Sequence, residues 1–188
     1  MKAYESNDRM ISLVNDLLGA DRIDSGKARY TLLSLQLVPV IESVIFEMMP
    51  QATARGLTIR FEKPEAPFPE VLADAERIRA VLQNLLENSV KYSRSGGTVQ
   101  VMLSRLSPEN AQVAVKDNGI GIPKEDQHNI FSRFFRAQNA VKMETDGSGL
   151  GLYIAKSIIE RHGGRIWFEG AEGQGVTFTF TLPLARMA

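Results

Sequence analysis

The sequence contains no cysteine, which excludes a disulfide framework and thiolate metal sites. Its two histidines, His128 and His162, are far apart and lack the spacing of metal ligands, so we expect no zinc or iron site. No apolar run approaches the roughly 20 residues that a membrane span needs, and the N-terminus has no signal-peptide pattern. We therefore expect this chain to make no contact with a membrane.

A dominant charge is also absent, because 22 lysines and arginines balance 22 aspartates and glutamates. Without a basic field, we expect no nucleic-acid partner. Hydrophobic residues make up 44% of the chain and charged residues 23%, as in an ordinary soluble globular protein. The length of 188 residues suffices for one compact domain with an appendage, or for two small domains.

Hydrophobic periodicity predicts the order of the elements. Near the N-terminus, Ile11, Val14 and Leu18 form a stripe typical of a helix in a bundle. Residues 119–149 show little regular pattern and should form a long loop, which is usually a functional feature. Between and around these segments we predict helices over 39–55, 75–92 and 150–161, and strands over 30–38, 57–61, 98–106, 111–116, 165–169 and 176–182.

This order predicts an α+β fold, a two-layer α/β sandwich. We expect a mixed, mostly antiparallel sheet of about five strands plus a C-terminal hairpin. Three main helices should cover one face of the sheet, preceded by the N-terminal helix.

The predicted helix 75–92 carries polar side chains beside its apolar stripe. Asn84, Asn88 and Lys91 lie within about 60° of one another on a helical projection. Amide oxygens and a lysine on one face can serve a hard cation and a phosphate, and magnesium takes few protein ligands. On this segment alone, a solvated helix face explains the pattern equally well.

Two glycine-containing segments follow. In the first, Asp117 could accept a hydrogen bond from an exocyclic amine, while Gly119 and Gly121 let the backbone approach a flat ligand. A simple Asp-Asn-Gly turn explains that segment better when it is taken alone. In the second, residues 147–151 lead into a helix and could cradle phosphate. Their spacing fits neither the Rossmann nor the Walker pattern, and a glycine hinge without a ligand is the alternative.

Residues 130–136 lie between the two glycine segments and contain three phenylalanines and two arginines. The phenylalanines should anchor the long loop, and the arginines could reach phosphate. The alternative is a small satellite core with surface charges. Taken together and in this order, the segments indicate a nucleotide site.

The sequence resembles the histidine kinase branch of the ATPase superfamily shared with gyrase, the Hsp90 chaperones and the MutL repair proteins. Residues 84–93 resemble the N box of that family and residues 117–121 its first glycine box. Residues 130–136 resemble its F box and residues 147–151 its second glycine box. The resemblance covers residues 28–184.

The resemblance implies that the chain binds ATP and Mg²⁺. Asn84 and Asn88 would hold Mg²⁺, and with Lys91 and Arg136 they would form the catalytic set. Tyr92 would lie against the adenine, whose amino group would donate to the aspartate of the first glycine box. The full nucleotide-binding set implied by the four boxes is Asn88, Lys91, Tyr92, Asp117, Gly119, Gly121, Ile122, Arg133, Arg136, Gly147, Ser148, Gly149, Leu150 and Gly151.

Members of the superfamily that hydrolyse ATP carry a glutamate base one helical turn before the magnesium asparagine. This chain has Asn84 there, and an amide cannot take a proton from water. Glu87 is one residue from Asn88 and should point about 100° away. We therefore expect transfer to a protein imidazole rather than rapid hydrolysis.

Residues 10–27 resemble the second helix of the dimerisation and phosphotransfer hairpin, and the first helix with its acceptor histidine is absent from this sequence. We therefore divide the chain into a partial dimerisation helix, 1–25, and an ATP-binding kinase catalytic domain, 26–188. The expected partners are the histidine-bearing hairpin of the same full-length kinase, a response regulator, and a second copy held weakly through residues 8–18. We expect a cytoplasmic location, with the cytoplasmic part of a membrane-anchored sensor as one setting.

Two alternative functions stay open. One is a degenerate nucleotide-binding module that regulates a partner without chemistry, although the complete boxes argue against it. The other is an ATPase clamp related to gyrase or Hsp90, which Asn84 disfavours. Of the histidines, His162 should be structural and His128 should lie on the surface.

Overall fold

The computed structural model describes Val14, Leu17 and residues 29–65, 67–144 and 147–185. Val14 and Leu17 are helical and about half exposed. The rest of the expected N-terminal helix and the boundary between 1–25 and 26–188 lie outside the described residues, so both stay predictions, as does weak dimerisation through residues 8–18.

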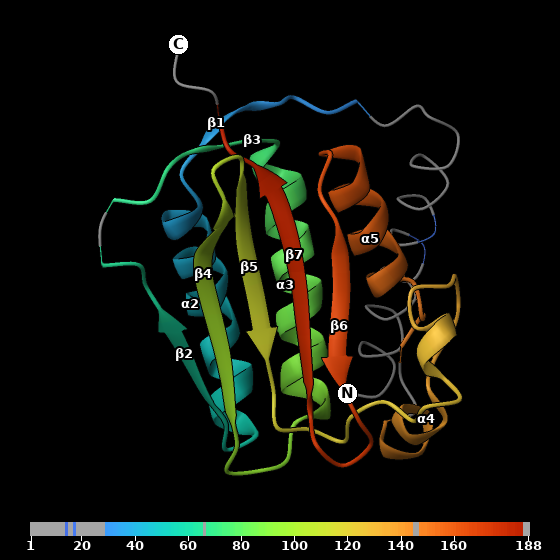
Figure 1. Cartoon of the computed structure of the whole chain (residues 1–188). Helices are drawn as coiled ribbons and strands as arrows, with labels where there is room; N and C mark the ends of the chain where they lie inside the picture. Colours follow the sequence, from blue (N-terminus) through green and yellow to red (C-terminus); the bar gives the residue numbers. More distant parts are fainter. Residues whose placement is uncertain (1–13, 15–16, 18–28, 66, 145–146, 186–188) are drawn as a thin grey trace.

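A five-stranded sheet forms one layer of the molecule (Figure 1). Its first strand, β2, runs parallel to β4, whereas every other neighbouring pair is antiparallel. This confirms the predicted mixed, mostly antiparallel sheet. The C-terminal hairpin belongs to the sheet instead of standing beside it. In spatial order the strands are β2 (Thr58–Glu62), β4 (Thr98–Ser107), β5 (Asn110–Lys116), β7 (Val176–Pro183) and β6 (Ile166–Gly170).

Three helices cover one face of this sheet, as predicted (Figure 1). They are α2 (Leu37–Ala54), α3 (Ala75–Tyr92) and α5 (Gly151–Arg161). The central helix α3 packs against both of the others. The core lies between the layers, where the apolar stripe of α3 meets the inward-facing side chains of the middle strands, such as Val101, Val115 and Phe180. Within the described parts of the chain, none of the helices is both long and apolar enough to cross a membrane.

Helix α3 has the bounds that its sequence predicts. Asp74 caps it, accepting a hydrogen bond from the amide of Arg77 at 3.1 Å. The predicted stripe is buried along its whole length, with Ile78, Leu82 and Leu85 fully inaccessible. The helix stops at Tyr92 because Ser93 takes an extended conformation. The polar residues beside the stripe therefore have fixed positions.

A second, two-stranded sheet differs from the predicted elements. It pairs β1 (Leu33–Leu35) with β3 (Val71–Ala73). The predicted strand 30–38 was too long, because Leu37 is buried as part of the apolar face of α2, which therefore starts before Pro39. Strand β3 was not predicted, since it is short and follows a proline-rich segment.

The long segment between β5 and α5 is more regular than predicted. It contains a 3-10 turn, η1 (Gln127–Asn129), and a short helix, α4 (Gln138–Met143). The amide of Gln138 donates to the buried carboxylate of Asp126 at 2.8 Å, which fixes the start of α4. We refer to residues 122–145 as the lid.

Candidate nucleotide site

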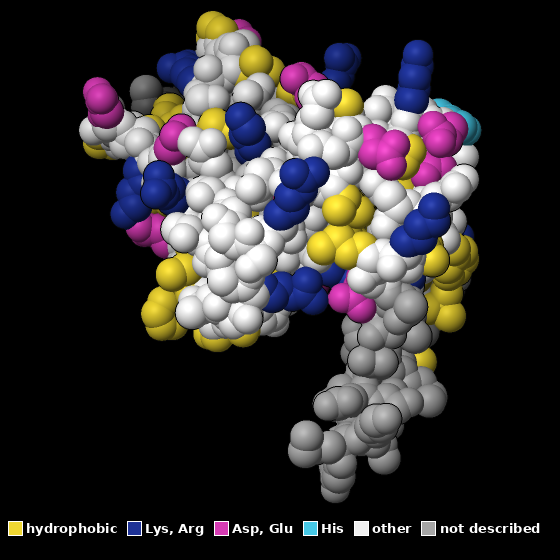
Figure 2. All heavy atoms as spheres, turned by 90° about the horizontal axis from the view of Figure 1, so that it is seen from below, with side chains coloured by type: hydrophobic (Ala, Val, Ile, Leu, Met, Phe, Trp, Pro, Cys, Tyr) yellow, Lys and Arg dark blue, Asp and Glu magenta, His cyan; other side chains and the backbone are white. Residues whose placement is uncertain are grey.

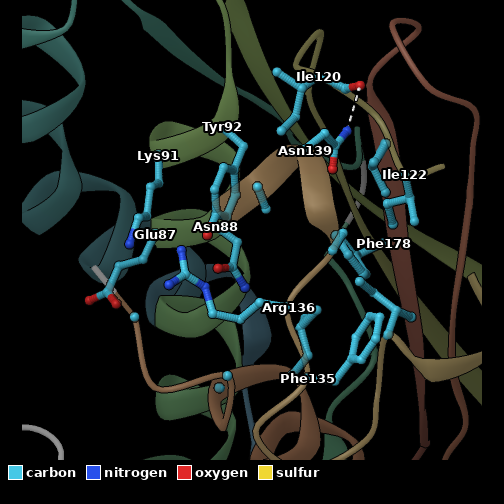
Figure 3. A pocket seen from close by; sticks show the side chains of 18 of the residues that line it. Glu87, Asn88, Lys91, Tyr92, Ile120, Ile122, Phe135, Arg136, Asn139 and Phe178 are labelled. Carbon is cyan, nitrogen blue, oxygen red and sulfur yellow. Dashed lines mark hydrogen bonds between the residues drawn. The ribbon is translucent and has the colours of Figure 1, made fainter. Parts of the chain in front are cut away.

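A cavity of about 560 Å³ lies between the flank of α3, the end of β5 and the lid (Figure 3). It brings together residues from all four predicted boxes, which are separated by up to 67 positions in the sequence. Of the residues predicted for the site, the cavity is lined by Asn84, Asn88, Lys91, Tyr92, Asp117, Gly121, Ile122, Arg136, Gly147, Ser148, Gly149 and Gly151.

Asp117 is the buried polar group of this cavity. One carboxylate oxygen, Oδ1, accepts hydrogen bonds from the backbone amides of Gly119, at 2.9 Å, and Val176, at 3.1 Å. The other oxygen, Oδ2, accepts from the hydroxyl of Ser89 at 3.3 Å. Ser89 is itself fully buried in α3. The carboxylate is therefore held from three elements, and its orientation is fixed before any ligand arrives.

Burial raises the pKa of the Asp117 carboxyl above its ordinary value, because the charged form loses its hydration. The hydrogen bonds from Gly119, Val176 and Ser89 act in the opposite direction and lower the pKa. An ionised aspartate in such a place is a strong acceptor for a donor group on a ligand.

Gly119 and Gly121 lie where the backbone packs too closely for a side chain. A β-carbon at Gly119 would lie 2.3 Å from the carbonyl oxygen of Tyr92, and one at Gly121 would lie 1.8 Å from that of Ala171. The protein's own backbone therefore requires both glycines, and their predicted contact with a flat ligand stays a prediction. Gly121 lines the cavity at φ +67°, whereas Gly119 is not among the cavity-lining residues.

The flank of α3 supplies the polar wall. The amide nitrogen of Asn84 donates to the carbonyl of Ala80 at 3.0 Å, so its oxygen is left to face outward from the helix. The ammonium of Lys91 lies 5.7 Å from the ring centre of Tyr92. Glu87 also lines the cavity, from an exposed position at its mouth (Figure 3). The helical projection set Glu87 about 100° from Asn88 and did not predict that it would line the cavity.

The start of α5 forms the opposite wall. Gly149 has φ +69°, and a β-carbon there would lie 2.7 Å from the backbone of Phe134. Ser148 accepts a hydrogen bond from the amide of Leu150 at 3.2 Å. Leu150 is buried and is not among the cavity-lining residues, so its predicted contact with the nucleotide stays a prediction. The glycines thus let the chain pass close to the lid before the helix begins.

Only two of the three phenylalanines in the segment 130–136 anchor the lid by packing inward. Phe131 packs against Phe168 and Phe178, with ring centres 6.1 and 6.3 Å apart, and Phe135 lines the cavity. Phe134 instead is 60% exposed and has a positive φ of 59°. Arg133 lies outside the cavity lining, with its guanidinium 5.3 Å from the ring centre of Tyr153. Its predicted phosphate contact stays a prediction.

Sequence reasoning missed three polar residues beside the cavity. Asn139 of α4 lines it and donates from its amide nitrogen to the carbonyls of Gly121 and Ile120, at 3.0 and 3.4 Å (Figure 3). Glu144 accepts from Arg136 through its backbone carbonyl, and Arg55 reaches Glu144 from α2. No local pattern marks these residues, because each acts across the fold.

Figure 2 views the molecule from the end at which α3 stops and the lid lies. Basic, acidic and apolar side chains are interspersed over this face. The described residues form no broad field of one sign on this face, in keeping with the formal net charge of zero. Attraction for an anion must therefore come from cations inside the cavity, namely Lys91 and Arg136.

Comparison with known proteins gives the class. A family model described as histidine kinase-, DNA gyrase B- and HSP90-like ATPase matches residues 73–186. The solved catalytic domain of histidine kinase ThkA is 30% identical, with a TM-score of 0.70, and the alignment covers 85% of this chain and all of that one. The chain therefore belongs to this ATPase family, in its histidine kinase branch.

Further relatives point the same way. The sensor histidine kinase WalK of Bacillus subtilis (strain 168) is 38% identical over 97% of this chain. The adaptive-response sensory kinase SasA of Synechococcus sp. (strain JA-3-3Ab) is 35% identical over 95% of it. The crystal structure of full-length ShkA in complex with AMPPNP has a TM-score of 0.84 at 32% identity and covers 98% of this chain.

The chain spans only part of these proteins. It covers 30% of WalK, 47% of SasA and 38% of the ShkA chain. Its similarity thus concerns the part of a sensor kinase that holds the nucleotide-binding boxes.

Proposed function

We propose that this chain binds Mg-ATP and transfers the γ-phosphoryl group to a histidine on a dimerisation hairpin, as the catalytic part of a sensor histidine kinase. The response regulator would then receive the group from that histidine. A cytoplasmic location follows from this proposal, since both ATP and the regulator are there.

The observation that carries the proposal is the fixed carboxylate of Asp117 in the wall of the cavity. The three groups that donate hydrogen bonds to this carboxylate belong to the protein, and the carboxylate still lines the cavity. An adenine offers an exocyclic amine as donor at that point, whereas guanine would offer a carbonyl oxygen and repel the carboxylate. The hydroxyl of Ser89 and two amides hold the acceptor in place for the base.

The other end of the cavity suits a triphosphate. Lys91 and Arg136 supply positive charge, and Gly147 to Gly151 lead into the N-terminus of α5, where amides and the helix dipole favour anions. These groups surround one space, so base and phosphates could be held at the same time.

The residues also fit Mg²⁺. Asn84 and Asn88 present amide oxygens on one face of α3, and the nitrogen of Asn84 is already used by Ala80. The described residues contain no cluster of three or more His, Cys, Asp or Glu that could hold a metal alone. Magnesium usually shares its ligands with substrate phosphates, so two amides are a suitable protein contribution. When bound, the ion would neutralise charge on the triphosphate.

The chain's own residues would then orient the nucleotide and neutralise charge. Asp117 would fix the base, Asn84 and Asn88 would hold Mg²⁺ against the phosphates, and Lys91 would contact the phosphates directly. Arg136 would reach the terminal phosphate from the lid. Asn84 cannot deprotonate water, so transfer to an imidazole, which is a nucleophile when neutral, is favoured over hydrolysis. Glu87 lies at the mouth of the cavity, which makes ATPase turnover the first control to run.

The test is transfer of label from γ-labelled ATP to a separately supplied hairpin that carries the acceptor histidine. We expect an acid-labile, base-stable label on the hairpin, and none when its histidine is replaced by alanine. Binding of ATP without transfer to a cognate hairpin would indicate a regulatory module instead. Steady phosphate release without any hairpin would indicate an ATPase clamp.

A further inference from the structure

Arg55 stands at the end of α2, outside the residues that the ATPase family model matches, yet it contacts Lys91 of the cavity wall and Glu144 of the lid. Its Nη1 donates to the backbone carbonyl of Lys91 at 2.9 Å. Its Nη2 forms an ion pair with the carboxylate of Glu144 at 3.3 Å. The partners are 36 and 89 residues away in the sequence, so Arg55 joins α2, α3 and the lid.

The backbone around Arg55 is well fixed. The amide of Arg55 closes α2 by donating to the carbonyl of Ala52 at 3.1 Å, and Gly56 follows with φ +68°. The carbonyl of Gly56 then accepts from the amide of Gly96 at 3.1 Å, in the turn after α3. The end of α2 is thus tied to the end of α3, and the guanidinium starts from a set position.

The bond to Lys91 has a clear physical basis. The last four carbonyls of a helix have no partner within it, and Lys91 lies in the last turn of α3. A guanidinium there satisfies one such carbonyl and also lies favourably at the negative end of the helix dipole. Arg55 therefore steadies the turn that carries the ammonium of Lys91.

The bond to Glu144 acts on the lid. Glu144 ends α4, and its backbone carbonyl accepts a hydrogen bond from Nη2 of Arg136. A β-carbon placed at Gly147 would lie 3.5 Å from both the guanidinium of Arg136 and the ammonium of Lys91. The two cations therefore converge at one end of the cavity. Arg55 contacts the backbone of Lys91 directly, and it contacts Arg136 indirectly, through the side chain of Glu144.

We propose that Arg55 is a positioning residue for the phosphate end of the site, acting through Glu144 on Arg136 and through a backbone carbonyl on Lys91. This inference rests on the proposed nucleotide binding. It predicts that replacing Arg55 weakens the binding of the phosphates and leaves the binding of the base unchanged. The reason is that the hydrogen-bond partners of Arg55 differ from the groups that fix Asp117, namely Ser89, Gly119 and Val176. An arginine suits the task, since its planar group can donate to two partners at once, which a lysine ammonium does less well.

The test compares ATP with AMP, which carries the same base but lacks the terminal phosphates, by competition against a fluorescent nucleotide. Arg55→Met should lower the affinity for ATP about two- to fivefold, which is the range for losing a half-exposed ion pair and one hydrogen bond. The affinity for AMP should stay unchanged, while the unfolding midpoint should fall only slightly, because one hydrogen bond to a helix end and one half-exposed ion pair are lost. Arg55→Lys should recover part of the loss. Arg60→Met, which removes an exposed arginine from β2, serves as the matched control and should alter neither affinity.

A double-mutant cycle completes the test. Glu144→Gln should also lower the affinity for ATP. In the double variant the fold-loss of affinity should be smaller than the product of the two single fold-losses. Independent effects, or equal losses for ATP and AMP, would overturn the inference. If the unaltered chain binds neither nucleotide, the proposed function fails as well. ATP binding that is insensitive to Arg55→Met would overturn the inference alone.

Discussion

The side-chain oxygen of Asn84 lies against Gly151, so that a β-carbon at position 151 would be 2.6 Å from Oδ1. Asn84 belongs to α3, and Gly151 is the first residue of α5. The nitrogen of Asn84 donates to Ala80, which limits how far the amide can turn away. This contact joins the first and last of the four boxes, and it explains why the phosphate-side helix must begin with a glycine.

Gly151→Ala should therefore displace the amide of Asn84. We expect Mg²⁺-dependent ATP affinity to fall by about 0.5–1.5 kcal/mol, the usual contribution of one hydrogen-bonding group. The free energy of unfolding should change by less than about 1 kcal/mol, since alanine favours the helix while the new contact opposes it. Nucleotide titrations with and without Mg²⁺, and urea unfolding, measure the two effects.

Asn84→Ala provides the matched background for that experiment. Once the amide has been removed, Gly151→Ala should have no further effect on the affinity for Mg-ATP. A loss of the same size in both backgrounds would mean that Gly151 acts through its own backbone and not through Asn84.

Asp117→Asn should separate binding from stability. We expect ATP affinity to fall by about 1.5–3 kcal/mol, because a charged acceptor for the base amine is replaced by a neutral amide. The fold should survive, since the asparagine oxygen can still accept from Gly119 and Val176, while the hydroxyl of Ser89 can turn to accept from the new nitrogen. An unchanged affinity in fluorescent nucleotide titration would sink the assignment of the base pocket.

The same variant should reveal the raised pKa of Asp117. Between the ordinary carboxyl value of 3.8 and the raised pKa, the folded chain binds more protons than the unfolded chain. The contribution of Asp117 to stability is therefore greatest at low pH and declines as the pH rises through that window. Asp117→Asn does not titrate, so the unaltered chain should lose stability relative to the variant as the pH rises from 3.8 through the raised pKa. Urea unfolding at several pH values measures this difference, and the opposite trend would refute it.

The parts of the fold that were predicted correctly depend on local chemistry. Helix α3 has a capping aspartate, a continuous apolar stripe and a glycine pair soon after its end, so its bounds could be predicted from neighbouring residues. Strand β3 could not, because it has three residues and exists through pairing with β1, which lies 36 or more residues earlier. The position of Gly119 against Tyr92 depends likewise on how β5 meets α3.

The site divides in the same way. Most of the cavity-lining residues could be predicted, because they lie within the four boxes, which are short and recognisable segments. Asp117 and Gly149 are examples. Arg55, Asn139 and Glu144 were missed because their partners lie on other elements. Glu87 was not assigned to the site, because a helical projection gives the direction of a side chain around the helix and does not show how wide the cavity beside the helix is.

Asn139 should limit the opening of α4 in the lid through its hydrogen bonds. Its amide nitrogen ties α4 to the carbonyl of Gly121, while its buried oxygen has no hydrogen-bond partner among the described residues. Asn139→Ala should speed amide hydrogen exchange within α4 about three- to tenfold, because one or two modest hydrogen bonds are lost. Gln138→Ala, an exposed neighbour on the same helix, is the control and should change little.

Nucleotide should also slow exchange in the lid. We expect protection of residues 122–144 when an ATP analogue and Mg²⁺ are added, with a smaller gain in Asn139→Ala. Equal exchange with and without ligand would show a lid that does not respond to the nucleotide.

The purified chain should bind ATP and yet fail to label itself with phosphate from γ-labelled ATP. His162 is 5% exposed, and both ring nitrogens are occupied. Its Nε2 accepts from the amide of Asp74 at 3.0 Å, which leaves the proton on Nδ1 for donation to the carbonyl of Ile158 at 2.8 Å. It also ends α5, so the eleven residues from Gly151 put it about 16 Å from the phosphate end of the cavity.

His128 is the other candidate, and its position is equally unsuitable. It is exposed in η1 and is not among the cavity-lining residues. Phosphoryl transfer needs the attacking nitrogen at about 3–3.5 Å from the phosphorus, in line with the leaving oxygen. Bringing His128 there would require the lid to fold back and would pull Arg136 from the cavity. We therefore expect label only on an added cognate hairpin. Acid-labile, base-stable label on the chain alone, lost in His128→Ala or His162→Ala, would show that it accepts the phosphoryl group itself.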